Sequence, residues 1–583
     1  MSKSLLKSTA IVSVMTFLSR IFGFVRDIII ALMFGASGAT DAFFVAFKIP
    51  NFLRRLFAEG AFSQAFIPVL SEYKTNDSAQ NLKQLINDVT GVLAVVLFMV
   101  TLLGVLIAPV LVLLFAPGYV SLNSSYETQS IVKIILPFVA FLCASALLSV
   151  FLMVYGKKKF GRFFIFFTIF SFFITPFIIH LIDPNLVELS HKYNLTVEML
   201  RLTFPYLFFI SLTALSGGIL NTFGKFSIPA LTPVLLNISL ITAAIIFSPY
   251  FNEPMIALAW GVFVAGLIQL LFQLPFLHQL KLLPKPSFNR HHPGVKKIGF
   301  LMLPALFGVS ITQINLLFDT LLASFLETGS VSWLYFSDRL VEFPMGLFGI
   351  AIATVILPSL SKKYQSSSSV QFSKTMDWAL KWVFLIGVPC SMGLLVLAEP
   401  MISTLFQYNA FVANDVMMSA KSLRAYSLGL LGFILIKVLA TGYFSRQDTK
   451  TPVKIGVIAM LSNMVMNLIF IFPFAHAGLA LATSLSAFVN AFLLYMGLKK
   501  ENIFHVDGSW LKFLFRIFFA GFMMLFCLVY LKGDVLVWES MSAWQRGGKL
   551  CGLIMMGILV YFCVLAVLGL RPKSLLDANI VDK

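Results

Sequence analysis

The segment VLAVVLFMVTLLGVLIAPVLVLL, residues 92–114, carries no charged side chain and decides what kind of fold this chain adopts. About 20 helical residues cross the roughly 30 Å hydrocarbon core of a bilayer, so a run of this length predicts a membrane-spanning helix. A membrane β-barrel would instead show shorter segments in which apolar and polar residues alternate. The segment therefore favours a helix that lies in lipid.

Runs of the same kind follow one another along the whole chain of 583 residues. Hydrophobic residues make up 59% and charged residues 12% of it, and its mean hydropathy is +0.92, which together exclude a water-soluble protein. The sequence thus predicts an all-α polytopic membrane protein with about 16 transmembrane helices. The predicted spans are residues 8–33, 41–72, 85–115, 129–155, 161–182, 198–223, 229–249, 254–279, 297–325, 331–361, 375–398, 415–442, 453–473, 477–498, 511–531 and 549–570.

Positive residues gather in alternate joints between the predicted spans. Residues 157–162 and 281–297 are rich in Lys and Arg, whereas residues 248–254 and 472–478 are almost free of them. By the positive-inside rule this alternation predicts that both termini are cytoplasmic. The net charge of +18 is then mainly a topology signal, and no nucleic-acid partner is expected.

Two internal repeats bear on the architecture. IVKIILPFVAFLCASALLSVFLMVYGKKKF (131–160) resembles MLRLTFPYLFFISLTALSGGILNTFGKF (199–226), which indicates that one helical hairpin, at about 129–182, is duplicated in tandem. A weaker, long-range repeat relates residues 25–71 to residues 317–361. Two related halves of the same orientation predict two helical bundles that flank a central path, the plan of an alternating-access transporter.

Charged and polar residues cluster within three predicted spans, although each charge at a helix centre costs about 2.5–3.5 kcal/mol. At helical spacing most of them fall on one stripe of their span, so polar faces are expected to look inward. These residues are Arg20, Arg26 and Asp27 on the first span, Asp41, Lys48, Arg54, Arg55 and Glu59 on the second, and Ser332, Asp338, Arg339 and Glu342 in the second half.

Two interpretations of this cluster stay open. The charges could form ion pairs that fasten the bundle, which is favoured for Asp27, Asp338 and Glu342 because each is close to an arginine in the sequence. Alternatively, the surplus of cations could bind an anionic substrate, since the guanidinium group offers a planar fork of donors suited to diphosphate and carboxylate. Arg55 lies near the cytoplasmic half of its span, where its side chain could simply reach the interface.

Three stretches resemble a known family. SRIFGFVRDIIIALMFGASGATDAFFVAFKIPNFLRRLFAEGAFSQAFIPVLSEYK (19–74), GSVSWLYFSDRLVEFPMG (329–346) and YFSRQDTKTPVKI (443–455) are similar to the MurJ (MviN) family of lipid II flippases, within the multidrug/oligosaccharidyl-lipid/polysaccharide exporter superfamily. The resemblance covers nearly the whole chain. It implies two helical lobes around a central cationic cavity, followed by two helices that form a groove for a lipid tail.

The resemblance also assigns domains and site residues. The expected regions are an N-terminal lobe (1–282), a C-terminal lobe (283–500) and the two extra helices (501–583). By similarity, Arg20, Arg26, Arg54 and Arg339 are cavity arginines, and Asp41, Glu59 and Ser332 occupy positions that the family uses. The chain departs from the family in one respect, because the duplicated hairpin raises the usual fourteen spans to about sixteen.

The function implied is translocation of lipid II, the undecaprenyl-diphosphate-linked peptidoglycan precursor, from the cytoplasmic to the periplasmic leaflet of the bacterial inner membrane. Lipid II, membrane lipids and the cell-wall synthesis machinery are the expected partners. No cofactor or metal is expected, and the membrane potential can drive an anion outward with about 2.3 kcal/mol per charge per 100 mV.

Three alternatives differ in chemistry. A flippase for another undecaprenyl-diphosphate-linked oligosaccharide would use the same cationic cavity. A small-molecule antiporter of the same superfamily that moves organic cations would need an acidic cavity, whereas the predicted cavity of this chain carries more basic than acidic residues. A membrane glycosyltransferase would need an acidic pair in a sizeable external loop, and no joint is long enough. The sequence also lacks a nucleophile-base pattern, a phosphate loop and a metal motif, so an enzyme is not expected.

Overall fold

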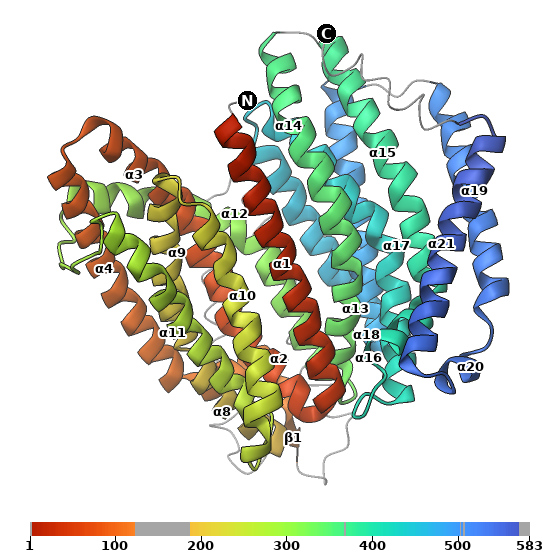
Figure 1. The fold of residues 1–583 in the computed structure, drawn as a ribbon, viewed down its shortest axis with the longest axis horizontal. Coiled ribbons are helices and arrows are strands. Elements are labelled where there is room, and N and C mark those ends of the chain that lie inside the picture. Colours follow the sequence, from red (N-terminus) through yellow and green to blue (C-terminus); the bar gives the residue numbers. More distant parts are fainter. Residues whose placement is uncertain (1–2, 123–186, 367–368, 502, 505–507, 571–583) are drawn as a thin grey trace. The chain divides into compact units, whose positions relative to one another are not determined.

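The computed structural model describes residues 3–122, 187–366, 369–501, 503–504 and 508–570. The predicted spans at 129–155 and 161–182, and with them the whole predicted duplicated hairpin, lie outside these residues. The chain divides into two compact units, Met1–Val331 and Ser332–Lys583. Each unit is built almost entirely of helices (Figure 1).

The first unit follows the predicted spans closely. Its elements are α1 (Lys3–Phe34), α2 (Gly38–Leu53), the π-helix η1 (Arg54–Phe62), α3 (Ser63–Asn76), α4 (Ala79–Leu106), α5 (Ala108–Phe115), the 3-10 turn η2 (Pro117–Tyr119), α8 (His191–Thr203), α9 (Tyr206–Thr222), α10 (Ser227–Thr242), the π-helix η3 (Ala243–Phe247), the 3-10 turn η4 (Ser248–Tyr250), α11 (Ile256–Gln279) and α12 (Pro293–Ser324).

Serine residues begin several of these helices. Ser37, Ser78 and Ser190 precede α2, α4 and α8, and each side-chain oxygen accepts a hydrogen bond from the backbone N–H three residues later. Such a cap satisfies one of the donors that the first turn of a helix leaves unpaired. Between their ends, α3, α4, α9 and α11 bury a common apolar cluster that includes Phe66 and Leu85. Capped ends and apolar middles are what spanning helices require.

A short antiparallel ladder forms the only strands in the described part of the chain. β1 (Val120–Leu122) pairs with β2 (Val187–Leu189), so that Leu122 lies opposite Val187. Opposed residues in such a ladder are about 5 Å apart between Cα atoms. Leu122 and Val187, the described residues on either side of segment 123–186, are therefore adjacent in space.

The second unit contains the remaining helices. They are α13 (Ser330–Pro344), which begins just before the unit boundary, the π-helix η5 (Met345–Gly349), α14 (Ile350–Gln365), α15 (Ser369–Val396), α16 (Ala398–Phe406), α17 (Ala413–Phe444), α18 (Lys450–Lys500), α19 (Ser509–Lys532), α20 (Val535–Glu539) and α21 (Ala543–Val567).

Element α18 is a helical hairpin, as the separate predicted spans 453–473 and 477–498 require. Ala475 leaves helical geometry with φ +48°, and a Cβ atom on Gly478 would lie 2.1 Å from the carbonyl oxygen of Phe470. Asn463 on the first limb donates to the Thr483 hydroxyl on the second limb at 3.3 Å. Residues at similar sequence separations before and after Ala475 thus face each other across the hairpin. This confirms the predicted break between spans 453–473 and 477–498.

Each predicted span within the described residues coincides with one or more helices, and ten helices there are long and apolar enough to cross a membrane. The long-range repeat also has a structural counterpart. In one unit the order is α2, η1, α3, and in the other it is α13, η5, α14, with a π-helical turn in the middle both times. Helix α2 continues through Pro50 to Leu53 and changes to π geometry at Arg54.

The boundary between the compact units differs from the predicted lobe boundary at residue 282. Helix α12 packs on η1 and α3 of the first unit. Lys297 pairs with Glu72 of α3 at 2.6 Å, and Ser324 at the other end of α12 accepts a hydrogen bond from Gly118 N at 3.1 Å. By these contacts α12 belongs to the first compact unit, and the lobe boundary at residue 282 stays a prediction.

Candidate functional site

The polar face of α1 is turned toward α10. The Arg26 guanidinium donates to Asp27 Oδ1 through Nε (2.9 Å) and Nη2 (2.6 Å), and through Nη1 to Asn237 Oδ1 at 3.1 Å. Asn237 in turn donates to the carbonyl oxygen of Ser19 at 3.2 Å. Gly23 lies beside this amide, and a Cβ atom there would be in ordinary van der Waals contact with Asn237 Nδ2, at 3.6 Å. These bonds fasten α1 to α10 between Ser19 and Arg26.

Arg26 and Asp27 are both buried, with 8% and 1% of their surfaces exposed. Arg20 lies on the same face about two turns earlier, and its side chain is exposed. In the described residues no acid lies within ion-pair distance of Arg20. The ion-pair interpretation thus fits Asp27, while Arg20 keeps an accessible positive charge.

Asp41 is a junction between three elements of the first unit. It is 1% exposed, and its Oδ2 accepts from Lys192 Nζ of α8 at 2.9 Å and from Gly329 N, after α12, at 2.8 Å. Lys192 also lies 4.1 Å from the ring centre of Tyr119. Burial, and secondarily the Asp41 charge, raise the pKa of the Tyr119 hydroxyl. Asp41 therefore joins the start of α2 to α8 and to the end of α12.

The other predicted residues of the second span lie at the change from α2 to η1. Arg54 opens η1, and its Nε donates to Asn51 Oδ1 at 2.9 Å. The side chains of Lys48, Arg54 and Arg55 are half-buried. Glu59 belongs to η1, but its side chain lies outside what the structure describes. π-Helical turns often occur at functional sites, since the extra residue redirects the side chains that follow it.

In the second unit, Arg339 lies within a polar group on α13. Its Nη1 donates to Glu342 Oε2 at 2.7 Å and its Nη2 to the Tyr335 hydroxyl at 3.1 Å, and the guanidinium lies 4.8 Å from the Tyr335 ring centre. The side chains of Arg339 and Glu342 are 32% and 42% exposed. Asp338 is half-buried, and Ser332 is completely buried. The pair with Glu342 is thus present but open to solvent.

Several side chains that bond within or beside these groups are not among the predicted residues. Asn237 and Lys192 contact predicted residues, and Asp415 accepts a hydrogen bond from the Trp333 indole at 2.9 Å. An asparagine inside the apolar run 229–249 was a detectable signal, because a buried amide needs a partner. Lys192 gave no such signal in the sequence, because it lies in a polar joint between spans, where a lysine is common.

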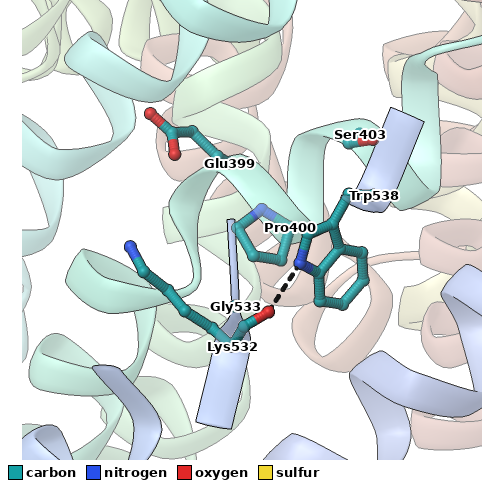
Figure 2. A pocket seen from close by; sticks show the side chains of 6 residues that line it. All are labelled: Glu399, Pro400, Ser403, Lys532, Gly533 and Trp538. Carbon is teal, nitrogen blue, oxygen red and sulfur yellow. Dashed lines mark hydrogen bonds between the residues drawn. The ribbon is translucent and has the colours of Figure 1, made fainter. Parts of the chain in front are cut away.

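A small pocket in the second unit involves none of the predicted residues. Figure 2 shows it between Glu399, Pro400 and Ser403 of α16 and Lys532, Gly533 and Trp538. The Trp538 indole closes one side by donating to the carbonyl oxygen of Lys532 at 2.9 Å. The pocket marks where the last helices attach to α16, and the described residues contain no group of side chains that could hold a metal ion.

The arrangement leaves two kinds of site residue. Arg26 with Asp27 is a buried pair, and Asp41 is a buried acid paired with the partly exposed Lys192; both pairs position helices. Arg20, Arg54 and Arg339 are exposed or half-buried cations, able to meet an anion from solvent. Arg339 belongs to the second unit and the other two to the first.

Comparison with known proteins identifies the relatives of this chain. A family model described as "Lipid II flippase MurJ" matches residues 30–163 and 158–544, two segments that overlap within the predicted duplicated hairpin. The "Probable lipid II flippase MurJ" of Vibrio cholerae is 46% identical, with 99% of each chain covered. The "Lipid II flippase MurJ" of Burkholderia cenocepacia is 36% identical, covering 97% of this chain and 98% of its own.

Solved structures agree with the sequence relatives. The structure titled "Lipid II flippase MurJ, inward closed conformation" superposes with a TM-score of 0.71 at 26% identity, and it covers 95% of this chain and 98% of its own. An inward-facing MATE family transporter of the MOP superfamily shares the fold at 12% identity, with a TM-score of 0.59 and coverage of 86% of this chain and 98% of its own. The predicted all-α polytopic membrane fold is thereby confirmed.

Proposed function

We infer, since the chain belongs to the MurJ family of lipid II flippases, that it moves lipid II across the membrane. It is a multi-pass membrane protein and a transporter, not an enzyme. The observation that carries the proposal is the family match over nearly the whole chain, and the residues matched by the family model include Arg54 and Arg339. The proposed direction is from the cytoplasmic to the periplasmic leaflet of the inner membrane.

The cations of the candidate site suit the headgroup of this substrate. Lipid II carries a diphosphate and acidic groups, and arginine binds such anions through paired N–H donors. Arg20 is exposed, Arg54 bonds the neutral Asn51 side chain, and Arg339 is a third open to solvent. In the proposed cycle these three bind the headgroup, and Arg26 holds α1 on α10 through Asp27 and Asn237.

The last two long helices are proposed to accompany the lipid tail. They contact α15, where the Tyr561 hydroxyl of α21 donates to the carbonyl oxygen of Leu385 at 2.9 Å. Their other flank is apolar and exposed, with Phe515, Phe526 and Met555 each more than half exposed. Such a flank can line a groove for a prenyl chain, because apolar surface is stable in contact with hydrocarbon.

Energy for the cycle is proposed to come from the membrane potential. An anion that leaves a negative interior gains about 2.3 kcal/mol per charge per 100 mV. Both termini are proposed to be cytoplasmic, because the basic joints alternate with joints that are nearly free of Lys and Arg. The cell-wall synthesis machinery is the proposed consumer of the exported substrate.

Transport by the purified chain in liposomes tests the proposal against its alternatives. Three substrates are compared: lipid II, another undecaprenyl-diphosphate-linked oligosaccharide, and a small organic cation. We expect an inside-positive potential and an inside-negative potential to change the rate of lipid II translocation in opposite directions. We expect the organic cation not to be transported. Faster movement of the other oligosaccharide would favour a different lipid-linked substrate, and movement of the cation alone would favour an antiporter.

A further inference from the structure

The loop between α11 and α12 is bound to the side of α4. Asn87 accepts from Lys285 N through its Oδ1 at 2.8 Å, and from Ser287 N through its carbonyl oxygen at 3.2 Å. Asp88, only 3% exposed, accepts from the Ser287 hydroxyl and from Asn289 Nδ2 at 3.3 Å. The loop therefore has a fixed position on the first unit, although it joins two helices by a stretch without regular structure.

The contact lies where α4 changes from polar to apolar. A Cβ atom on Gly91 would lie 2.1 Å from the carbonyl oxygen of Ser287, so the loop backbone touches α4 directly at this residue. Asp88 is the last charged residue of α4, and beyond Gly91 the helix exposes a flank of apolar side chains. That flank consists of Val95, Val96, Phe98, Met99, Leu102 and Leu103. The loop thus lies at the level where lipid headgroups meet hydrocarbon.

At this level the loop presents one aromatic ring to the outside. Phe288 lies between Ser287 and Asn289, both of which bind Asp88, yet the Phe288 side chain is 63% exposed. A phenylalanine held outward by its two neighbours is costly in water, whereas it is stable where a bilayer covers it.

Positive charge surrounds the ring. Lys281, Lys285 and Arg290 are exposed, and none has an acid within ion-pair distance in the residues that the structure describes. Arg290 donates to His291 Nε2 at 3.3 Å, a neutral partner or a second cation. The nearby Glu72 is paired with Lys297, and Asp88 is occupied by the loop itself. This surface therefore has no local acid left to neutralise it.

We propose that residues 281–290 form a docking surface for anionic phospholipid headgroups, with Phe288 inserted among the acyl chains and Lys281, Lys285 and Arg290 on the phosphates. The rigid attachment to Asn87 and Asp88 supports this, because a preformed surface loses little entropy on binding. Basic side chains next to an interfacial aromatic ring are the combination that anionic membrane surfaces bind. The surface is far in sequence from the proposed cavity arginines, so its test does not depend on the transported substrate.

Fluorescence quenching in nanodiscs tests the proposal. The full-length Phe288→Trp variant is placed in discs of phosphatidylethanolamine with a fixed minority of phosphatidylglycerol, and bromine is carried either by the anionic or by the zwitterionic lipid at equal mole fraction. The signal of the natural tryptophans is subtracted using the unsubstituted protein. We expect quenching by the brominated anionic lipid to exceed that by the brominated zwitterionic lipid by roughly twofold or more.

A matched pair of charge variants identifies the cause. Lys285→Gln with Arg290→Gln, on the Phe288→Trp background, should bring the two quenching values together. Lys499→Gln with Lys500→Gln removes the same charge from exposed positions of the second unit and should leave the difference intact. Equal quenching by both lipids before any charge is removed would overturn the choice of an anionic partner. Absence of quenching by either would show that Phe288 meets water or protein, which would overturn the docking surface itself.

Discussion

Replacement of Arg339 distinguishes a substrate-binding cation from half of a structural ion pair. The structure gives the scale of the structural loss. The Arg339–Glu342 pair is partly open to solvent, with side chains 32% and 42% exposed, and such pairs contribute about 0.2–1 kcal/mol. The bond to the Tyr335 hydroxyl contributes about 1 kcal/mol, and the guanidinium over the ring about 0.5–1 kcal/mol. These three contacts together contribute about 2–3 kcal/mol to stability, which is the scale of the structural loss expected for Arg339→Ala.

Loss of a substrate contact would instead lower transport activity and leave the amount of folded protein unchanged. A hydrogen bond to a charged group contributes about 1.5–3 kcal/mol, so losing even one reduces headgroup affinity by roughly tenfold or more. We expect Arg339→Ala to abolish growth of a flippase-depleted strain while the protein remains in the membrane. Arg339→Lys keeps the charge but not the planar fork, and should be impaired less severely.

Two control variants make this prediction sharp. Glu342→Gln removes only the ion pair and should support growth. Arg424→Gln breaks a comparable pair of the same unit, Arg424 with Glu399 at 2.8 Å, and should lower abundance slightly without stopping transport. Complementation is scored together with membrane abundance for every variant. The reasoning is refuted if Arg339→Ala regains function when combined with Glu342→Gln, since Arg339 would then only balance Glu342.

Three further predictions follow from other parts of the structure. Arg26→Gln leaves the buried Asp27 carboxylate without its cation, which costs about 3–5 kcal/mol, so membrane abundance should fall and Asp27→Asn should restore it; an unchanged abundance of Arg26→Gln would contradict this. Because Leu122 and Val187, which flank segment 123–186, are paired in the β ladder, a chain that lacks this segment should still insert and complement, and a stable but inactive deletion would place the segment in the transport path. For topology, a cysteine at the exposed Tyr250 should react with an impermeant reagent in intact cells and one at Lys285 should not, whereas the reverse result would invert the proposed orientation.

The positions of the helices could be predicted from the sequence because a long run of apolar residues in a membrane protein nearly always forms a spanning helix. The break at Ala475 was predictable for the same reason, since a polar joint separates two long apolar runs there. The pair of Arg26 with Asp27 was also accessible, because the partners are neighbours in the sequence. The partners Asn237 and Lys192 were not, because a helical wheel gives the face of a side chain but not the helix that this face meets.

The duplicated hairpin remains a prediction, and the repeats constrain it further. The offset between the two halves is larger at Ile67 and Leu357 than at Gly224 and Ser445. The amount by which the first offset exceeds the second is the length of chain added to the first half. It agrees, to within about two residues, with the sequence separation of Pro137 and Pro205, which occupy the same position in the two copies of the hairpin. One extra hairpin in the first half accounts for both offsets. The assignment of α12 could not be predicted in this way, because it depends on contacts with η1 and α3.

The sidedness of lipid II in living cells tests the central claim most directly. The chain is depleted in its host, and the fraction of lipid II that an impermeant enzyme can reach from the periplasm is measured as the protein disappears. The account predicts that total lipid II rises while the reachable fraction falls, and that restoring the intact chain, but not Arg339→Ala, reverses both changes. A reachable fraction that stays constant after depletion, in a host without a second flippase, would contradict the claim that this protein moves lipid II.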